Sequence, residues 1–193
     1  MKCSISFGVT ALLGVGLLGG CSSGPLATVG AAAGAGPVSE IRAGVLDHDV
    51  IGPGPERGGA DLSAELLFVK PFTSSDRLLN SLLPRPDIGG TVSFGGRTSA
   101  AYAGAAWDYD FTDRIFGEVG FGGSINDGDA GPTASPGHNA LGSNILFRES
   151  ATLGYRISPN WSVMGTIEHM SNAGLAANNA GLTNVGARIG YAF

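Results

Sequence analysis

Residues 144–171 read NILFRESATLGYRISPNWSVMGTIEHMS, two runs in which apolar residues alternate with polar or small ones. A turn around Pro159 and Asn160 separates the runs. Alternation of this kind is the pattern of a β-strand with one apolar face, and two such strands joined by a tight turn form an antiparallel hairpin. One face of this hairpin carries Ile145, Phe147, Leu153, Tyr155, Trp161, Val163 and Ile167.

The same alternation recurs along the chain and gives about eight strand segments. They lie at 40–50, 60–70, 87–95, 99–111, 114–123, 144–157, 161–171 and 184–193. Each is close to the ~9–11 residues that a tilted strand needs to cross a bilayer. The face opposite the apolar one holds the charges, namely Arg42, Glu65, Asp108, Asp110, Glu118, Arg148, Arg156, Glu168 and Arg188.

These segments predict an all-β fold, an eight-stranded antiparallel transmembrane β-barrel of the outer-membrane type. Its charged face would line the lumen and its apolar face would meet lipid. Alternation alone does not separate this from a soluble barrel of the lipocalin kind, whose apolar set points inward. The strand lengths, the charged face and a secretion signal favour the membrane. We expect the tight turns at 111–115 and 157–162 to face the periplasm, for which the connection 70–86 is long.

The N-terminus predicts export. Residues 1–20 have Lys2 followed by an apolar stretch, the pattern of a signal peptide. The sequence LLGGC ending at Cys21 resembles a lipoprotein cleavage box, which would make Cys21 the lipid-modified first mature residue; cleavage after Ala31 is the alternative. Residues 21–38 are expected to be a Gly/Ala-rich linker and 39–193 the barrel. The net charge of −5 and the lack of a basic patch argue against nucleic acid as a partner.

His169 is one of three histidines, and it precedes Ser171 by two residues on the segment 161–171. Both share the parity of the apolar face, so we expect them on the outer wall near the outer leaflet. Two such residues lie roughly 6–7 Å apart at Cα, a gap that an imidazole can bridge to a hydroxyl. The pair suits a general base and a nucleophile. An H-x-S alone is also the pattern of an ordinary polar pair at the membrane interface.

Residues 168–193, EHMSNAGLAANNAGLTNVGARIGYAF, resemble the C-terminal signature of the PagL-type lipid A 3-O-deacylases. The close match covers these 26 residues, and the rest matches in architecture. The resemblance implies an outer-membrane esterase that removes the 3-O-linked hydroxyacyl chain of lipid A without a cofactor or metal. It implies Ser171 as nucleophile, His169 as general base and Asn172 in a supporting role. The terminal Tyr191 and Phe193 resemble the signal that such barrels present to the barrel assembly machinery.

The chain departs from this family at the catalytic acid. The family carries a Glu fourteen residues after the His, and here that position is Thr183. Pairing residues across the turn at Pro159-Asn160 places Glu149 opposite His169, so we hypothesise that Glu149 substitutes for the missing acid. Three outcomes stay open: a weaker dyad, another acid, or lost activity. The last would make the protein a non-enzymatic outer-membrane barrel that retains a remnant motif.

The other two histidines give weaker signals. His48 lies between Asp47 and Asp49, and a solvated loop is favoured over a cation site there. His138 is expected in a flexible loop, and the sequence identifies no partner for it.

Overall fold

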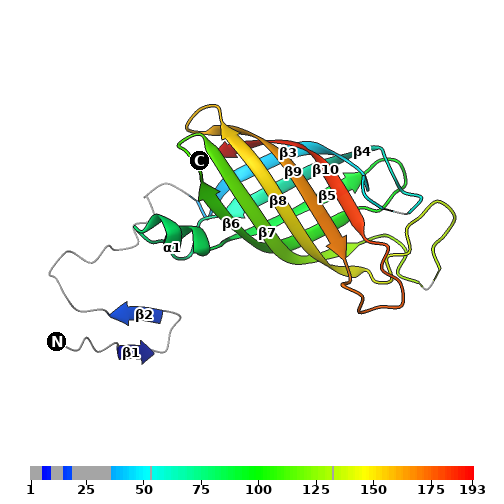
Figure 1. The fold of residues 1–193 in the computed structure, drawn as a ribbon, viewed down its shortest axis with the longest axis horizontal. Helices are drawn as coiled ribbons and strands as arrows, with labels where there is room; N and C mark the ends of the chain where they lie inside the picture. The colour runs from blue at the N-terminus through cyan, green and yellow to red at the C-terminus, as the bar shows by residue number, and fades with distance from the viewer. Residues whose placement is uncertain (1–5, 10–14, 19–35, 53, 132) are drawn as a thin grey trace. The chain divides into compact units, whose positions relative to one another are not determined.

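The computed structural model describes residues 6–9, 15–18, 36–52, 54–131 and 133–193 (Figure 1). The chain divides into two compact units, Met1–Ala31 and Ala32–Phe193. In the first, β1 (Ser6–Val9) pairs antiparallel with β2 (Val15–Leu18), within the expected signal peptide. Cys21 and most of the expected linker lie outside the described residues, so lipidation and cleavage stay predictions.

The second unit is a closed antiparallel barrel of eight strands, in which β10 pairs with β3 (Figure 1). This confirms the predicted fold and number of strands. The strands are β3 (Val38–Asp47), β4 (Ala60–Phe68), β5 (Arg85–Ser93), β6 (Ala100–Asp110), β7 (Ile115–Asn126), β8 (Ile145–Arg156), β9 (Trp161–Ser171) and β10 (Leu182–Ala192).

The connection between β4 and β5 contains a short helix that the strand pattern did not predict. This helix, α1 (Arg77–Leu82), begins after Asp76, whose carboxylate accepts a hydrogen bond from the backbone of Leu79 at 2.9 Å. An Asp at this position satisfies a free N–H of the first turn. The helix accounts for the length of the connection. No helix among the described residues is long and apolar enough to cross a membrane.

Charged side chains fill the barrel interior and pair with one another across it. Arg42 lies 2.6 Å from Glu118, and both Arg148 and Arg188 lie 3.1 Å from Glu168. All five are buried. A buried charge is tolerated when an opposite charge and hydrogen bonds compensate its lost hydration. The interior is therefore an ionic core, as the charged strand face predicts.

Large apolar side chains cover the outside of the barrel. Those most exposed on the strands include Leu62, Val119, Ile125, Ile145, Leu153 and Ile189, each at least half exposed. An apolar exterior around a polar interior is the arrangement of a transmembrane barrel and the reverse of a soluble one. The observed burial thus resolves the ambiguity that alternation alone leaves.

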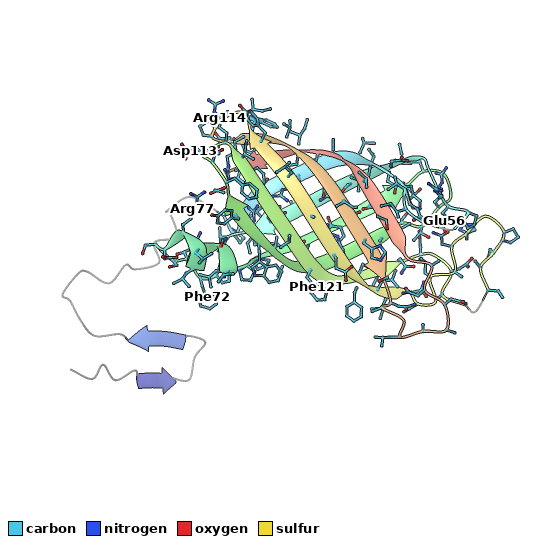
Figure 2. All side chains as sticks on the ribbon, viewed as in Figure 1. Glu56, Phe72, Arg77, Asp113, Arg114 and Phe121 are labelled. Carbon is cyan, nitrogen blue, oxygen red and sulfur yellow. The ribbon has the colours of Figure 1, made fainter. Side chains whose placement is uncertain are left out.

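The two ends of the barrel differ. At one, here called the turn end, lie the turns at 111–114 and 157–160, α1 and the C-terminus (Figure 1). Tyr191 stacks edge-on against Trp161 and Phe193 there, at ring-centre distances of 4.9 and 5.4 Å. At the other, the loop end, lie the connections 48–59, 94–99, 127–144 and 172–181. Figure 2 shows Arg114 and Asp113 at the turn end and Glu56 at the loop end.

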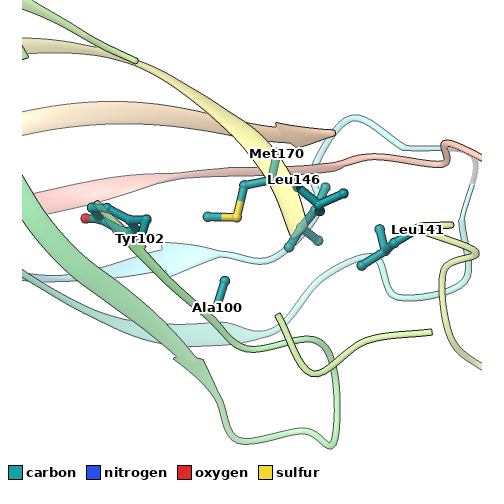
Figure 3. Close-up of a cluster of buried hydrophobic side chains, with 6 residues drawn as sticks. Ala100, Tyr102, Leu141, Leu146 and Met170 are labelled. Carbon is teal, nitrogen blue, oxygen red and sulfur yellow. The ribbon is translucent and has the colours of Figure 1, made fainter. Parts of the chain in front are cut away.

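A small cluster of buried apolar side chains lies near the loop end of the barrel (Figure 3). It comprises Ala100, Tyr102, Leu141, Leu146, Met170 and Leu182, all buried. Leu141 comes from the long connection between β7 and β8, and Met170 lies between the two candidate catalytic residues of β9. The cluster therefore fixes the end of β9 from inside.

Candidate active site

His169 and Ser171 lie on the outward face of β9, at its loop end. Both are partly exposed, whereas their neighbours Glu168, Met170 and Asn172 are buried. This alternation follows from the pleat of the strand, which sends successive side chains to opposite sides. His169 and Ser171 therefore lie on the same side of β9 as the exposed Val163 and Ile167.

His169 has a partner directly opposite on each neighbouring strand. Glu149 of β8 faces it on one side and Thr183 of β10 faces it on the other. The register predicted across the turn at Pro159-Asn160 is confirmed. Directly opposed residues have Cβ atoms ~4.5–5.5 Å apart, so both side chains are within reach of the imidazole.

Thr183 makes the hydrogen bond to the imidazole. Its hydroxyl oxygen lies 2.8 Å from Nδ1 of His169. With the proton on Nδ1, the imidazole donates to Thr183 and presents Nε2 as the basic nitrogen. Thr183 is buried, at 6 % exposure, so it holds the ring firmly. It stands at the position where the resemblance implies an acid, and it carries no charge.

Glu149 is exposed on the outer wall, and within the described ranges no hydrogen bond or ion pair joins it to His169. Its other neighbour is Phe121 of β7, whose ring stacks on Phe147 at 6.2 Å. Phe147 in turn lies opposite Ser171. The polar residues of the site are therefore bordered by aromatic surface on the β7–β8 side.

No hydrogen bond joins His169 to Ser171 among the residues that the structure describes. Catalytic hydrogen bonds are often long before substrate binds, so this does not count against the pair. The two residues share one strand face and are held by a rigid strand.

Asn172 holds the connection between β9 and β10 in shape. Its side-chain amide donates to the carbonyl oxygens of Leu141 at 2.7 Å and Asn178 at 2.5 Å. Its Oδ1 accepts from the backbone of Gly174 at 2.9 Å. These contacts occupy both ends of the side chain, which favours a positioning role over direct contact with substrate.

Gly181 is a neighbour of the imidazole that sequence reasoning missed. It has a φ of 69°, and a Cβ built there would lie 3.0 Å from Cε1 of His169. Glycine therefore satisfies the backbone angle and leaves room at the ring edge. The signal in the sequence was a Gly just before the last strand.

The expectation that His48 lies in a solvated loop is wrong. His48 is fully buried, with Nδ1 2.6 Å from Asp61 and Nε2 3.0 Å from Glu56. Burial opposes its charge, but the hydrogen bonds and charges of Asp61 and Glu56 outweigh this and raise the pKa of His48 to about 9. Burial also opposes charge on Glu56, yet His48 and the backbone N–H groups of Asn139 and Thr98 lower the pKa of Glu56 to about 2.

His138 also has a partner, which the sequence did not identify: its Nδ1 lies 3.4 Å from Glu56. Because Glu56 contacts both His48 and His138, it links the connection 48–59 to the connection 127–144 at the loop end. The described residues contain no group of three or more His, Cys, Asp or Glu side chains arranged to hold a metal ion.

Comparison with known proteins identifies the family. The family model described as lipid A 3-O-deacylase (PagL) matches residues 87–192, more than half of the chain and all of the candidate site. A crystal structure of the outer membrane enzyme PagL is 20 % identical and covers 80 % of this chain and 100 % of its own, with a TM-score of 0.63. A de novo designed transmembrane β-barrel is 15 % identical and covers 81 % of this chain and 96 % of its own, with a TM-score of 0.52. No curated protein sequence matches. The chain belongs to the PagL family of lipid A 3-O-deacylases.

Proposed function

We propose that this protein is an integral outer-membrane esterase that removes the 3-O-linked hydroxyacyl chain of lipid A. The observation that carries the proposal is the position of the His169 imidazole. Its Nδ1 contacts Thr183, and His169 lies two residues from Ser171 on the same outward face of β9. The match to the deacylase family supports lipid A as the substrate on which His169 and Ser171 would act.

Ser171 acts as the nucleophile and His169 as the general base. Nε2 of His169 takes the proton as Oγ of Ser171 adds to the ester carbonyl. The tetrahedral intermediate then expels the sugar 3-oxygen, which takes that proton from the imidazolium. This leaves an acyl group on Ser171. Water, deprotonated by His169, hydrolyses the acyl-enzyme and releases a free 3-hydroxy fatty acid.

The place of the site on the outer wall suits a substrate that is itself a membrane lipid. With the loop end facing outward, the acyl esters of the outer leaflet lie level with His169 and Ser171. The acyl chains can lie along the apolar surface that Phe121 and Phe147 form beside the site. The enzyme then needs no pocket in the lumen, which its ionic core fills.

In this proposal, two residues replace the two roles of the missing acid, which are to orient the imidazole and to stabilise the imidazolium. Thr183 orients the imidazole through its hydrogen bond to Nδ1. Glu149, opposite His169 on the other side, supplies negative charge that favours the imidazolium formed during the reaction. Two further roles belong to the proposal. Asn172 holds the β9–β10 connection through its side-chain amide. Tyr191 and Phe193 at the C-terminus present the signal to the barrel assembly machinery.

A non-enzymatic barrel is the second candidate, and Thr183 is the observation that favours it. A neutral hydroxyl cannot supply the charge that orients and stabilises an imidazolium in serine hydrolases. The protein would then contribute to the outer membrane as a structural or surface-interaction protein.

Mass spectrometry of lipid A from a Gram-negative host that expresses the chain separates the two candidates. A matched culture expresses Ser171→Ala, which removes only the hydroxyl. We expect wild type to convert lipid A to a species lighter by one 3-hydroxyacyl group, and the variant to leave it unchanged. Unchanged lipid A in both cultures, with the wild-type barrel folded in the outer membrane, would favour the non-enzymatic protein.

A further inference from the structure

The connection between β3 and β4, residues 48–59, meets the start of β10 beside the site. The backbone N–H of Val50 donates to the carbonyl oxygen of Thr183 at 2.7 Å. Thr183 is also the residue whose hydroxyl contacts His169. Asp47, His48 and Asp49, which the sequence analysis noted, therefore lie near the proposed general base. Val50, which follows them, contacts Thr183, and Thr183 contacts His169.

Asp49 makes the main contacts between this connection and β10. Its Oδ1 accepts from the backbone N–H of Thr183 at 3.2 Å, and its own N–H donates to Asn184 at 3.0 Å. Together with Val50, it binds the backbone of Thr183 at both the N–H and the carbonyl. Asp49 is fully buried and has a φ of 45°, an angle that Asp and Asn adopt more readily than most residues.

The other oxygen of Asp49 links to a second connection. Oδ2 accepts from the side-chain amide of Asn139 at 2.8 Å, and the same amide lies 3.4 Å from the carbonyl oxygen of Gly181. Gly181 is the residue at the edge of the His169 ring. Asp49 and Asn139 therefore hold the backbone of residues 181 and 183, the two positions that border the imidazole on the β10 side.

Glu56 anchors these contacts at the loop end. It accepts hydrogen bonds from the backbone N–H groups of Thr98 and Asn139, both at 2.9 Å, and it contacts His48. It thus joins three connections, those at 48–59, 94–99 and 127–144. Since His48 is also bonded to Asp61 of β4, the segment that carries Asp49 is fixed from both sides.

We propose that Asp49 is a positioning residue for catalysis, which holds Thr183 so that its hydroxyl keeps His169 aligned with Ser171. The inference rests on the proposed esterase function. A neutral Thr binds the imidazole less strongly than the family Glu would, so alignment of His169 depends more on where the backbone of Thr183 lies. Asp49 fixes that backbone without contacting the substrate or the imidazole.

Three variants test the role of Asp49. Asp49→Ala removes both acceptors, and Asp49→Asn keeps an oxygen for the N–H of Thr183 while it loses the charge. Asp47→Ala is the matched control, because Asp47 is exposed at the end of β3, two residues away. Each barrel is purified, and its folding is checked by its change in electrophoretic mobility on heating.

Two measurements on the folded barrels separate positioning from general stability. The first is amide hydrogen exchange by NMR, which reports the Thr183 N–H directly, with the Val185 N–H as internal reference. The second is steady-state deacylation of lipid A, in parallel with the rate at which a fluorophosphonate labels Ser171. Labelling needs an aligned His169 but no lipid A, so it tests Asp49 even if the substrate is a different ester.

We expect Asp49→Ala to speed exchange at Thr183 and to lower kcat and the labelling rate together by about 10–100-fold, as a small misplacement of a catalytic group does. KM should change less than twofold. Asp49→Asn should recover much of the loss, and Asp47→Ala should match wild type. The inference is overturned if folded Asp49→Ala keeps wild-type exchange at Thr183, or labels as fast as wild type. Wild type that labels at Ser171 but does not deacylate lipid A would overturn the proposed substrate alone, and wild type that does neither would overturn both.

Discussion

The imidazole of His169 meets a hydroxyl at the position where the resemblance to the deacylases implies a carboxylate. Thr183 contacts Nδ1 at 2.8 Å and so orients the ring, but a hydroxyl can donate as well as accept and does not by itself select the tautomer. It cannot stabilise the imidazolium by charge, which in serine hydrolases is a large part of what the acid does. If His169 acts as the proposed general base, the reaction rate should respond to any charge added or removed beside it.

Restoring the family acid should raise activity. In Thr183→Glu, a carboxylate replaces the hydroxyl beside Nδ1, and we expect kcat for lipid A deacylation to rise by at least about tenfold, because the imidazolium gains an adjacent charge. In Thr183→Val, which lacks the hydrogen bond, kcat should fall by a similar factor. Equal rates for wild type and both variants would show that residue 183 does not orient the base.

Glu149 should contribute charge without being essential. We expect Glu149→Gln to lower kcat about threefold to tenfold, because the carboxylate faces His169 across the β8–β9 pair without a hydrogen bond. Ser171→Ala in the same assay should abolish turnover. A Glu149→Gln enzyme as fast as wild type would remove Glu149 from the mechanism.

The strands of this protein were predictable, and its connections were not. The alternation in 144–171 fixes which face of the sheet each residue takes, and the tight turn at Pro159-Asn160 sets the register of β8 against β9. That register alone places Glu149 opposite His169. The same alternation puts Thr183 on the face of His169, but only the structure shows that the two are directly opposite, because no tight turn joins β9 and β10.

The contacts of His48 and Asp49 could not be predicted from the sequence. Their partners Glu56, Asp61 and Asn139 belong to three different segments, and no periodicity relates those segments to one another. Connections fold by specific hydrogen bonds of this kind, which leave no repeating pattern. Helix α1 was missed for a related reason, since six residues are too few for helical periodicity to show.

The buried His48 should make the loop end sensitive to alkali. The pKa of His48 is about 9 when folded and about 6.5 when free, so its stabilisation is complete below about pH 6.5 and is lost as the pH rises through 9. Glu56 has the opposite sign. Its pKa is about 2 when folded and about 4.5 when free, so its stabilisation is complete above about pH 4.5 and is lost as the pH falls towards 2.

Urea unfolding across this pH range measures the effect. Stability should be highest between about pH 4.5 and 6.5 and should decline on both sides. His48→Gln should flatten the alkaline decline, since glutamine does not titrate. An alkaline decline as steep in His48→Gln as in wild type would assign it to another group.

The ionic core of the barrel also makes Glu168 a sensitive position. Glu168 lies between Arg148 and Arg188 and accepts from Thr91 at 2.9 Å. Glu168→Ala leaves two buried guanidinium groups without this partner, and we expect it to lower the free energy of unfolding by about 3–5 kcal/mol. Urea unfolding of the purified barrel measures this.

Glu149→Gln is the matched control for that variant, because it removes a carboxylate from the outward face of the neighbouring strand. It should not destabilise the barrel, since Glu149 is exposed and its removal leaves no buried charge. If the Glu168→Ala and Glu149→Gln barrels had the same free energy of unfolding, the pairing of Glu168 with Arg148 and Arg188 would not contribute to stability.

The barrel has its charged side chains inside and its apolar side chains outside. This arrangement accounts for the position of the candidate active site. The lumen is filled largely by paired charges, and an apolar cluster lies near its loop end. The outer wall is largely apolar, and His169, Ser171 and Glu149 lie on it near the loop end. An enzyme whose substrate is the surrounding lipid can place its site there.

Release of fatty acid by the purified barrel tests this account most directly. Wild type and Ser171→Ala are each reconstituted with lipid A, and free 3-hydroxy fatty acid is quantified by mass spectrometry over time. We predict steady release by wild type and none above background by Ser171→Ala. Release at equal rates by both, or no release by a folded wild-type barrel, would contradict the account.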